Sequence, residues 1–235
     1  MFPQFGNHST IVTMVKVASY THIGTRKKNE DALIVDEPLG LYAVADGVGG
    51  GLHGDIASRM VVERVHRSRA EGVTLRKAID LAQKELVDFS IKNFGDPLMG
   101  TTFTAVEVKK DGLQLAHVGD SRCYHFTGKM LRQLTEDHES YEESMQNTVL
   151  SDYVGMPDEM IPLKVQSEFL PFSGTQRFLL STDGLHKQLS AQEIVTVIEK
   201  CDSVPTDVVQ RLCHVATQRD ESDNVTVIFM EITFG

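Results

Sequence analysis

The order in which strand-like and helix-like segments follow one another limits the folds that are open to this chain. Nine runs have the apolar or alternating character of β-strands, and most gaps between them are too short to hold a helix. These runs, bounded mostly by Gly, Asp, Asn or Pro, are Ile11–Ser19, Ala32–Val35, Leu41–Ala45, Thr101–Val108, Leu113–Val118, Cys123–Phe126, Leu163–Phe169, Arg177–Ser181 and Val225–Ile232. Most strands must therefore follow one another directly.

Helical periodicity occurs in two pairs of segments, one before and one after the long central run of strands. The segments are Ile56 to about Ala70, Leu75 to about Phe94, a helix after the capping box of Ser190 and Glu193, and a helix from Pro205 through Ala216. We expect Thr74 to cap the second helix. Helices grouped in pairs between runs of strands indicate antiparallel sheets with helices on their outer faces, rather than a doubly wound parallel sheet.

One stretch lacks any such pattern. Glu136–Pro162 is acidic and is broken by Gly155, Pro157 and Pro162, so we predict a long surface loop that is either functional or mobile. No internal repeat, low-complexity tract or linker divides the sequence. We therefore expect a single domain over residues 1–235.

Composition and charge exclude several classes of protein. The 23 Lys and Arg against 33 Asp and Glu give a formal charge of −10, whereas nucleic-acid binders need a basic face. The three cysteines are far apart and odd in number, which argues against a disulfide framework or a zinc knuckle. The first 15 residues lack the features of a signal peptide, and no apolar run is long enough for a membrane span. We expect a cytoplasmic protein that binds neither nucleic acid nor membrane.

Aspartate repeatedly stands where an apolar run meets a turn. Asp46, Asp120 and Asp183 each end such a run, and Asp223 precedes the last one. Any one of them is explained by the preference of aspartate for turns. Four carboxylates on one rim, however, would raise one another's pKa strongly unless cations neutralised them.

The candidate ligands at these positions are all oxygen atoms. Without paired cysteines or a histidine motif, such a set favours hard cations such as Mg²⁺ or Mn²⁺ over Zn²⁺. Two such ions about 3.5–4 Å apart can activate a shared water and clamp the attacking and leaving oxygens of an in-line displacement. The pattern therefore indicates phosphoryl hydrolysis.

The glycine run from Gly49 to Gly54 formally fits two nucleotide-binding motifs. It matches G-x-G-x-x-G, but a helical segment replaces the acidic strand end that a dinucleotide site needs about 20 residues later. It also has the glycine spacing of a phosphate-binding loop, yet Asp55 and Ile56 stand where Lys and Ser or Thr are required. We therefore assign no nucleotide site to these glycines.

Seven motifs occur in an order that matches a known family. They are Gly24–Ala32, Val44–Gly50, Gly100–Thr102, Val118–Arg122, Leu134–His138, Leu180–Leu185 and Ser222–Thr226. From about Ser19 to Ile232 the chain thereby resembles the metal-dependent type 2C protein serine/threonine phosphatases, or PPM phosphatases, in their short bacterial form. The resemblance implies an α+β fold, a four-layer αββα sandwich of two antiparallel sheets flanked by helix pairs, with the metal site in a cleft at one edge of the sheets.

The resemblance also implies a role for each acidic motif residue. Asp46 would bridge two Mn²⁺ or Mg²⁺ ions, and the carbonyl of Gly47 would join one of them. Asp183 and Asp223 would complete the coordination of the other.

The second ion would be held by Glu30, with Asp31 beside it, directly or through water. Asp120 together with Asp183 matches the pair that binds a third, weaker ion in bacterial members. Arg26 matches the arginine that grips the substrate phosphate.

A phosphate-binding role for Arg26 can also be argued from charge. A phosphomonoester approaching a chain of charge −10 must meet local positive charge, and two divalent ions plus one guanidinium supply about +5. In isolation the basic run Arg26–Lys28 would predict a solvated side chain. Its spacing to Glu30 favours phosphate binding.

Other motif residues are expected to play supporting parts. Asn224 would orient Asp223, Thr101 and Thr102 would support the central strands, and His138 would be a buried, hydrogen-bonded histidine.

The sequence departs from the family's pattern at several places, including Asp55 where Glu is usual and His186 where an aromatic residue is frequent. Val48 stands where eukaryotic relatives have a histidine thought to protonate the leaving group, so the general acid is not identified. Glu139–Tyr153 replaces a longer flap beside the cleft, which affects substrate selectivity more than catalysis.

Together these features predict a monomeric phosphatase that hydrolyses phosphoserine and phosphothreonine with a metal-activated water. Its partners would be phosphorylated proteins, including a Ser/Thr kinase or the substrates of that kinase. One alternative is a catalytically inactive PPM-like binding module, which Mn²⁺ would not stabilise. Another is an enzyme acting on a small phosphoester or on a sigma-factor regulator.

Overall fold

The computed structural model of the protein describes residues 14–48, 53–95, 97, 99–143, 146–157, 163–219 and 223–234. Several sequence predictions fall outside these residues: the start of the first strand at Ile11, the glycines Gly49–Gly51, Pro162 at the end of the predicted loop, and Ser222.

The described strands form two five-stranded antiparallel sheets and a separate hairpin. In the first sheet the order is β1 (Met14–His22), β12 (Val225–Phe234), β11 (Gly174–Ser181), β6 (Arg122–Thr127) and β7 (Met130–Gln133). In the second sheet it is β10 (Gln166–Pro171), β5 (Gly112–Val118), β4 (Phe103–Lys109), β3 (Leu41–Asp46) and β2 (Asp31–Asp36). The hairpin pairs β8 (Glu139–Glu142) with β9 (Asn147–Leu150).

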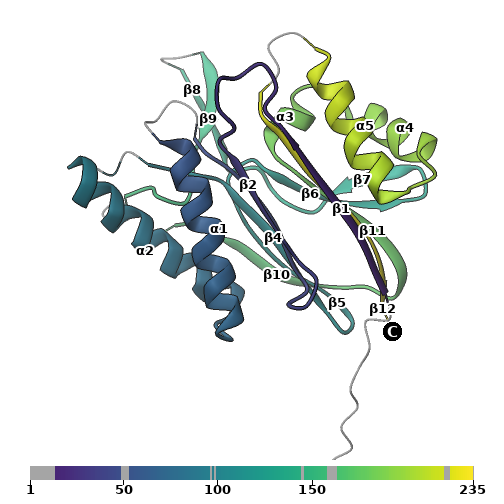
Figure 1. Ribbon diagram of the computed structural model, residues 1–235, viewed down its shortest axis with the longest axis horizontal. Coiled ribbons are helices and arrows are strands. Elements are labelled where there is room, and N and C mark those ends of the chain that lie inside the picture. Colours follow the sequence, from purple (N-terminus) through teal and green to yellow (C-terminus); the bar gives the residue numbers. More distant parts are fainter. Residues whose placement is uncertain are drawn as a thin grey trace, which may run out of the picture.

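Helix pairs cover the outer faces of the two sheets (Figure 1). Helices α1 (Gly54–Ala70) and α2 (Leu75–Phe94) lie on the second sheet, while α4 (Ala191–Lys200) and α5 (Pro205–Thr217) lie on the first. A short helix, α3 (Asp183–His186), follows β11 directly. The predicted α+β fold, a four-layer αββα sandwich, is confirmed.

The two central strands show why their sequences are almost continuously apolar. In β12, Val227 and Phe229 pack towards the helices, whereas Ile228 and Met230 pack between the sheets. Because successive side chains of a strand point to opposite faces, a strand buried on both sides needs apolar residues at every position. The same alternation in β3 carries this strand through two cores before it ends at Asp46.

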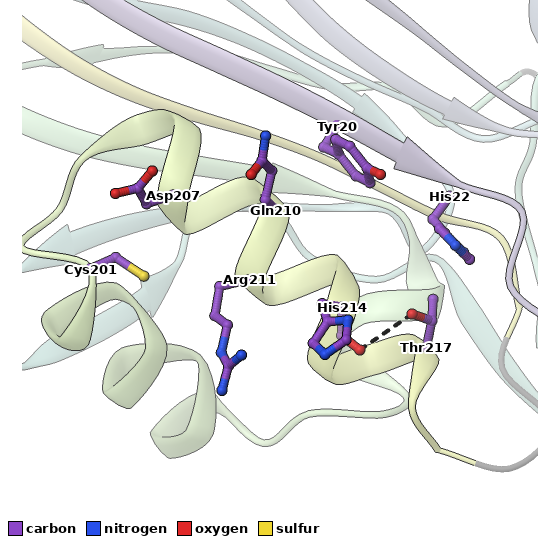
Figure 2. A pocket seen from close by; sticks show the side chains of 8 residues that line it. All are labelled: Tyr20, His22, Cys201, Asp207, Gln210, Arg211, His214 and Thr217. Atoms are coloured by element: carbon purple, nitrogen blue, oxygen red, sulfur yellow. Dashed lines mark hydrogen bonds between the residues drawn. The ribbon is translucent and has the colours of Figure 1, made fainter.

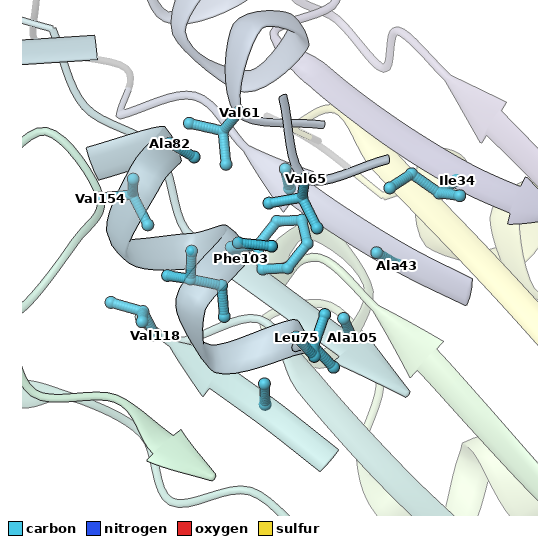
Figure 3. Close-up of a cluster of buried hydrophobic side chains, with 14 of the residues drawn as sticks. Ile34, Ala43, Val61, Val65, Leu75, Ala82, Phe103, Ala105, Val118 and Val154 are labelled. Carbon is cyan, nitrogen blue, oxygen red and sulfur yellow. The ribbon is translucent and has the colours of Figure 1, made fainter. Parts of the chain in front are cut away.

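Three apolar layers thus hold the sandwich together. One lies between α1, α2 and the second sheet, and Figure 3 shows Phe103 at its centre, with Val65 and Leu75 of the helices around it. A second lies between the two sheets, and the third lies under α4 and α5. Both sheets are therefore fixed relative to each other, which fixes the strand ends that bear the acidic residues.

Two helix-start predictions had different outcomes. The capping box is present, because the Ser190 hydroxyl accepts a hydrogen bond from the Glu193 amide while the Glu193 carboxylate accepts one from the Ser190 amide. Thr74 occupies the N-cap position of α2 as predicted, but its side chain makes no capping hydrogen bond.

The sequence analysis missed β7, α3 and the hairpin β8–β9. The hairpin lies inside the stretch predicted as a plain loop, Glu136–Pro162, so that description was wrong. Val154, farther along the same stretch, is fully buried and pairs with Thr101. That residues 1–235 form a single domain stays a prediction.

No helix in the described ranges is both long enough and apolar enough to cross a bilayer.

Candidate active site

The strand-end aspartates lie at one end of the sandwich. Asp31 and Asp46 face each other across the antiparallel pair of β2 and β3. Asp183 begins α3, and its carboxyl group is hydrogen-bonded to that of Asp46. In Figure 1, α3, the hairpin β8–β9 and the loop from β1 to β2 gather at this same end. Segments far apart in the sequence therefore bring their acidic side chains into one neighbourhood.

The backbone of Asp46 is fixed by two buried threonines. Its amide donates to the Thr102 hydroxyl at 2.9 Å, and its carbonyl accepts from the Thr101 hydroxyl at 2.8 Å and from the Thr102 amide at 2.8 Å. The predicted supporting role of these threonines is confirmed. Asp46 is held rigidly although it ends a strand, where backbone groups would otherwise lack partners.

A close backbone contact places Glu30 beside Gly47. The Gly47 amide donates to the Glu30 carbonyl at 3.1 Å, and a Cβ on Gly47 would lie 2.3 Å from the carbonyl oxygen of Gly54. A Cβ on Gly54 would in turn lie 3.2 Å from Oε1 of Glu30. Glycine is required at position 47, because any side chain there would collide with the start of α1.

Asn224 ties the loop from β1 to β2 to the rest of the site. Its Oδ1 accepts from the Glu30 amide at 2.7 Å, and its Nδ2 donates to the carbonyls of Ile23 at 2.8 Å and Lys28 at 3.0 Å. The Asn224 amide also donates to Oδ1 of Asp223 at 2.8 Å. The expected orientation of Asp223 is confirmed, and the side chain of Asn224 does more, since it anchors the loop that bears Arg26 and Glu30.

Arg26 lies against one of the acidic residues. Its guanidinium forms an ion pair with Oδ2 of Asp223 at 2.5 Å, and its side chain is about half exposed. Its positive charge also interacts with Asp183 and Glu30. Arg26 thus stands at the solvent side of the acidic neighbourhood, where an anion could replace a carboxylate as its partner.

Two carboxylate oxygens in this neighbourhood are buried without a hydrogen-bond partner. They are Oδ1 of Asp31 and Oδ1 of Asp183. The other oxygen of Asp31 accepts from the Thr182 hydroxyl at 2.9 Å. A buried acceptor without a donor is costly, and a hard cation is the partner that such an oxygen prefers. The donor chemistry therefore fits Mg²⁺ or Mn²⁺.

The pKa values show how crowded the carboxylates are. Burial, aided by neighbouring Asp183, raises the pKa values of Asp31 and Asp120 to about 7. Burial, with the charges of Asp31 and Asp183, raises the pKa of Asp46 well above its usual range. Burial alone would raise the pKa of Asp183 as well, but the Lys187 ammonium and the hydrogen bond from Asp46 lower it. Part of the negative charge of these aspartates is thus neutralised, by protons on those with raised pKa values and by the Lys187 ammonium beside Asp183.

Lys187 is the site residue that the sequence analysis missed. Its ammonium contacts the carboxylate of Asp183 and lies 3.9 Å from Oδ2 of Asp120. A spacing of four residues from Asp183 would have indicated the contact, but only if the short helix α3 had been predicted.

The carboxylates lie near one another but do not surround a single point. Among the described residues, no three Asp, Glu, His or Cys side chains form a ready-made metal cluster. Asp223 is paired with Arg26, and Oδ2 of Asp183 with Lys187. Asp223 would therefore exchange Arg26 for a metal ion, whereas Asp183 can offer its partnerless Oδ1 and keep Lys187.

A small cleft of about 120 Å³ opens between these residues. The hairpin β8–β9 lines it through Glu139 and Leu150, and Val48 is also among the lining residues. The remaining lining residues are Asp46, Thr102, Asp120, Thr148, Asp183 and Lys187. The hairpin thus occupies the position predicted for a flap.

His138 is a structural residue. It is buried, its Nδ1 accepts from the Gly119 amide at 3.3 Å, and its ring packs on that of His117. The prediction of a buried, hydrogen-bonded histidine is confirmed.

A larger groove of about 650 Å³ lies elsewhere, between β1 and α5. Figure 2 shows Tyr20 and His22 of β1 facing Gln210 and His214 of α5 across it. Asp207 is the only carboxylate among its lining residues. Its chemistry offers nothing comparable to the acidic cleft, so the cleft is the candidate active site.

Comparison with known proteins agrees with the fold and the motifs. The family model described as protein phosphatase 2C matches residues 19–222. The serine/threonine phosphatase stp of Listeria welshimeri is 30% identical over 212 residues, which cover 81% of this chain and 84% of that protein.

Solved structures give the same result. The structure of PppA, described as a key regulatory component of T6SS in Pseudomonas aeruginosa, superposes with a TM-score of 0.81 at 28% identity and covers 94% of this chain and 99% of its own. The catalytic domain of the phosphatase PstP in complex with two manganese ions shares the fold, with a TM-score of 0.76 at 24% identity over 93% of this chain and 98% of its own. The chain is therefore a member of the protein phosphatase 2C family of metal-dependent serine/threonine protein phosphatases.

Proposed function

We propose that this phosphatase hydrolyses phosphoserine and phosphothreonine in proteins at the acidic cleft, with two divalent ions held there. The ligands would be Asp46, the Gly47 carbonyl, Asp183 and Asp223, together with Glu30 and Asp31. The observation that supports this most directly is the pair of buried, partnerless oxygens on Asp31 and Asp183, which begin β2 and α3.

Mn²⁺ and Mg²⁺ both suit this donor set, which consists of oxygen atoms alone. When bound, the two ions supply a nucleophilic water of lowered pKa and neutralise charge on the phosphoryl group. The PstP catalytic domain, a structural neighbour of this chain, was solved with two manganese ions, and this agrees with the proposal.

The chain's own residues would position the reaction. Arg26 would leave Asp223 and donate to the phosphate oxygens, which a planar guanidinium can grip with two parallel hydrogen bonds. Thr101, Thr102 and Asn224 would keep Asp46 and the loop of Glu30 in place. The wall formed by β8–β9 would shield the cleft on one side.

The contact of Lys187 with Asp120 and Asp183 affects how many divalent ions the cleft can bind. The resemblance gives Asp120 and Asp183 a third, weaker ion, but these two carboxylates now share the Lys187 ammonium. We therefore propose two ions for the reaction.

The setting proposed for the enzyme is the cytoplasm, where it would act as a monomer on phosphorylated proteins that include a Ser/Thr kinase or its substrates. Cys123, Cys201 and Cys213 are free thiols, which suits a reducing compartment.

Hydrolysis of p-nitrophenyl phosphate tests the proposal. We expect activity with Mn²⁺, loss of that activity on chelation, and loss in Asp46→Ala. Activity that survives full chelation or the substitution would contradict the metal mechanism. An inactive binding module would show neither turnover nor a higher melting temperature with Mn²⁺. A panel of phosphopeptides set against small phosphoesters would separate a protein phosphatase from an enzyme of small substrates.

A further inference from the structure

A lysine lies between the two aspartates to which the family resemblance assigns a third cation. The Lys187 ammonium contacts the carboxylate of Asp183 and lies 3.9 Å from Oδ2 of Asp120. The side chains of these two aspartates are only 12% and 7% exposed. Their negative charges are therefore met mainly from within the protein rather than by water.

Backbone hydrogen bonding fixes the position of the Lys187 main chain. Lys187 follows α3 directly, and its amide donates to the Asp183 carbonyl at 2.9 Å. One helical turn therefore separates the two residues, which places their side chains on the same face. The contact between Lys187 and Asp183 thus follows from the local fold.

Asp120 has no other basic partner within 4.0 Å among the described residues. Its other charged neighbours, Asp46, Asp183 and Glu139, are negative. Lys187 is thus the group that offsets the charge of this pair. A divalent ion bound to the same oxygens would lie within a few ångströms of the ammonium and be repelled by it.

We propose that Lys187 substitutes for the third cation, so that this chain binds two divalent ions and excludes a third at Asp120 and Asp183. The inference rests on the proposed function for the first two ions. Lys187 acts here as a positioning residue, because its effect on the ions is exerted through the two carboxylates that it contacts.

The number of bound ions tests the proposal. Metal-free protein is titrated with Mn²⁺ up to several millimolar, and free Mn²⁺ is followed by electron paramagnetic resonance and heat by calorimetry. We expect two ions for the wild type. Lys187→Gln should bind a third ion with a dissociation constant of about 0.1–1 mM, the range of the weakest calcium sites in proteins.

Three further variants locate the effect. Lys187→Arg keeps the charge and should bind two ions. Lys109→Gln removes a lysine that pairs with Glu107 at 2.6 Å, and it should also bind two. Adding Asp120→Asn to Lys187→Gln should abolish the third site and return the count to two. Melting curves of the metal-free proteins confirm that each variant is folded.

The outcomes separate the two proposals. Three ions in the wild type, or two in Lys187→Gln, would overturn the role of Lys187 and leave the two-ion phosphatase intact. A wild type that binds no ion would overturn the proposed function and this inference with it.

Discussion

Removing the side chain of Asn224 should loosen the active-site loop and weaken the fold by a predictable amount. The residue is 4% exposed, and its amide group makes three hydrogen bonds, to the Glu30 amide and to the carbonyls of Ile23 and Lys28. A typical hydrogen bond contributes about 1 kcal/mol net, so Asn224→Ala should lower the free energy of unfolding by about 3 kcal/mol. For a domain of this size that is a fall in melting temperature of about 6–12 °C.

Urea unfolding measures the loss, and Asn93→Ala provides the matched control. The Asn93 amide makes one exposed hydrogen bond, to the Phe89 carbonyl at 2.8 Å, so this variant should lose less than about 1 kcal/mol. Asn224→Ala should also raise KM for p-nitrophenyl phosphate, because Arg26 lies on the released loop. Equal stability of the two variants would refute the anchoring role. A large loss of stability with unchanged KM would instead refute the link between the loop and phosphate binding.

The remaining predictions concern charge and space. Because the folded pKa values of Asp31 and Asp120 are raised to about 7 from an ordinary value near 4, the metal-free protein keeps protons that the unfolded chain has lost. Its melting temperature should therefore fall as the pH rises from about 4 to 7, and Mn²⁺ should reverse the fall; a rise without metal would contradict the carboxylate crowding. Burial and the neighbouring His138 ring lower the pKa of His117 to about 4, so its contribution to stability is complete above about pH 6.5 and is lost as the pH falls towards 4. Relative to His117→Gln, the wild type should lose up to about 3 kcal/mol more over that interval in urea unfolding, and parallel curves would refute the assignment. Gly47→Ala should abolish phosphatase activity and destabilise the protein by at least about 1–3 kcal/mol, because its Cβ would lie 2.3 Å from the Gly54 carbonyl oxygen; an active, equally stable variant would show that α1 can move away.

The parts of the fold that could be predicted from sequence are those with a two-sided or periodic burial pattern. Strands β3 and β12 are apolar at successive positions because both faces are covered, and α2 was predicted with its bounds because one face packs on the sheet. The strands β8 and β9 were missed because they are short and largely exposed, so backbone pairing rather than a pattern of apolar side chains defines them.

The candidate site shows the same division. Asp46, Asp183 and Asp223 could be chosen from sequence because each stands at a strand end and within a motif. Lys187 belongs to no such pattern, since its contact exists only after α3 forms. The ion pair of Arg26 with Asp223 could not be foreseen either, because these two residues are far apart in the chain.

The wall of the cleft is separable from the framework that supports it. None of the described residues of the hairpin β8–β9 belongs to the three apolar layers. Mutations there change the shape and charge of the cleft entrance without leaving a cavity in a core. The preference for one phosphoprotein over another can therefore evolve at this wall with little loss of folding stability. Substitutions at the acidic centre cost more stability, because its turns are held by buried threonines, an asparagine and a close glycine contact.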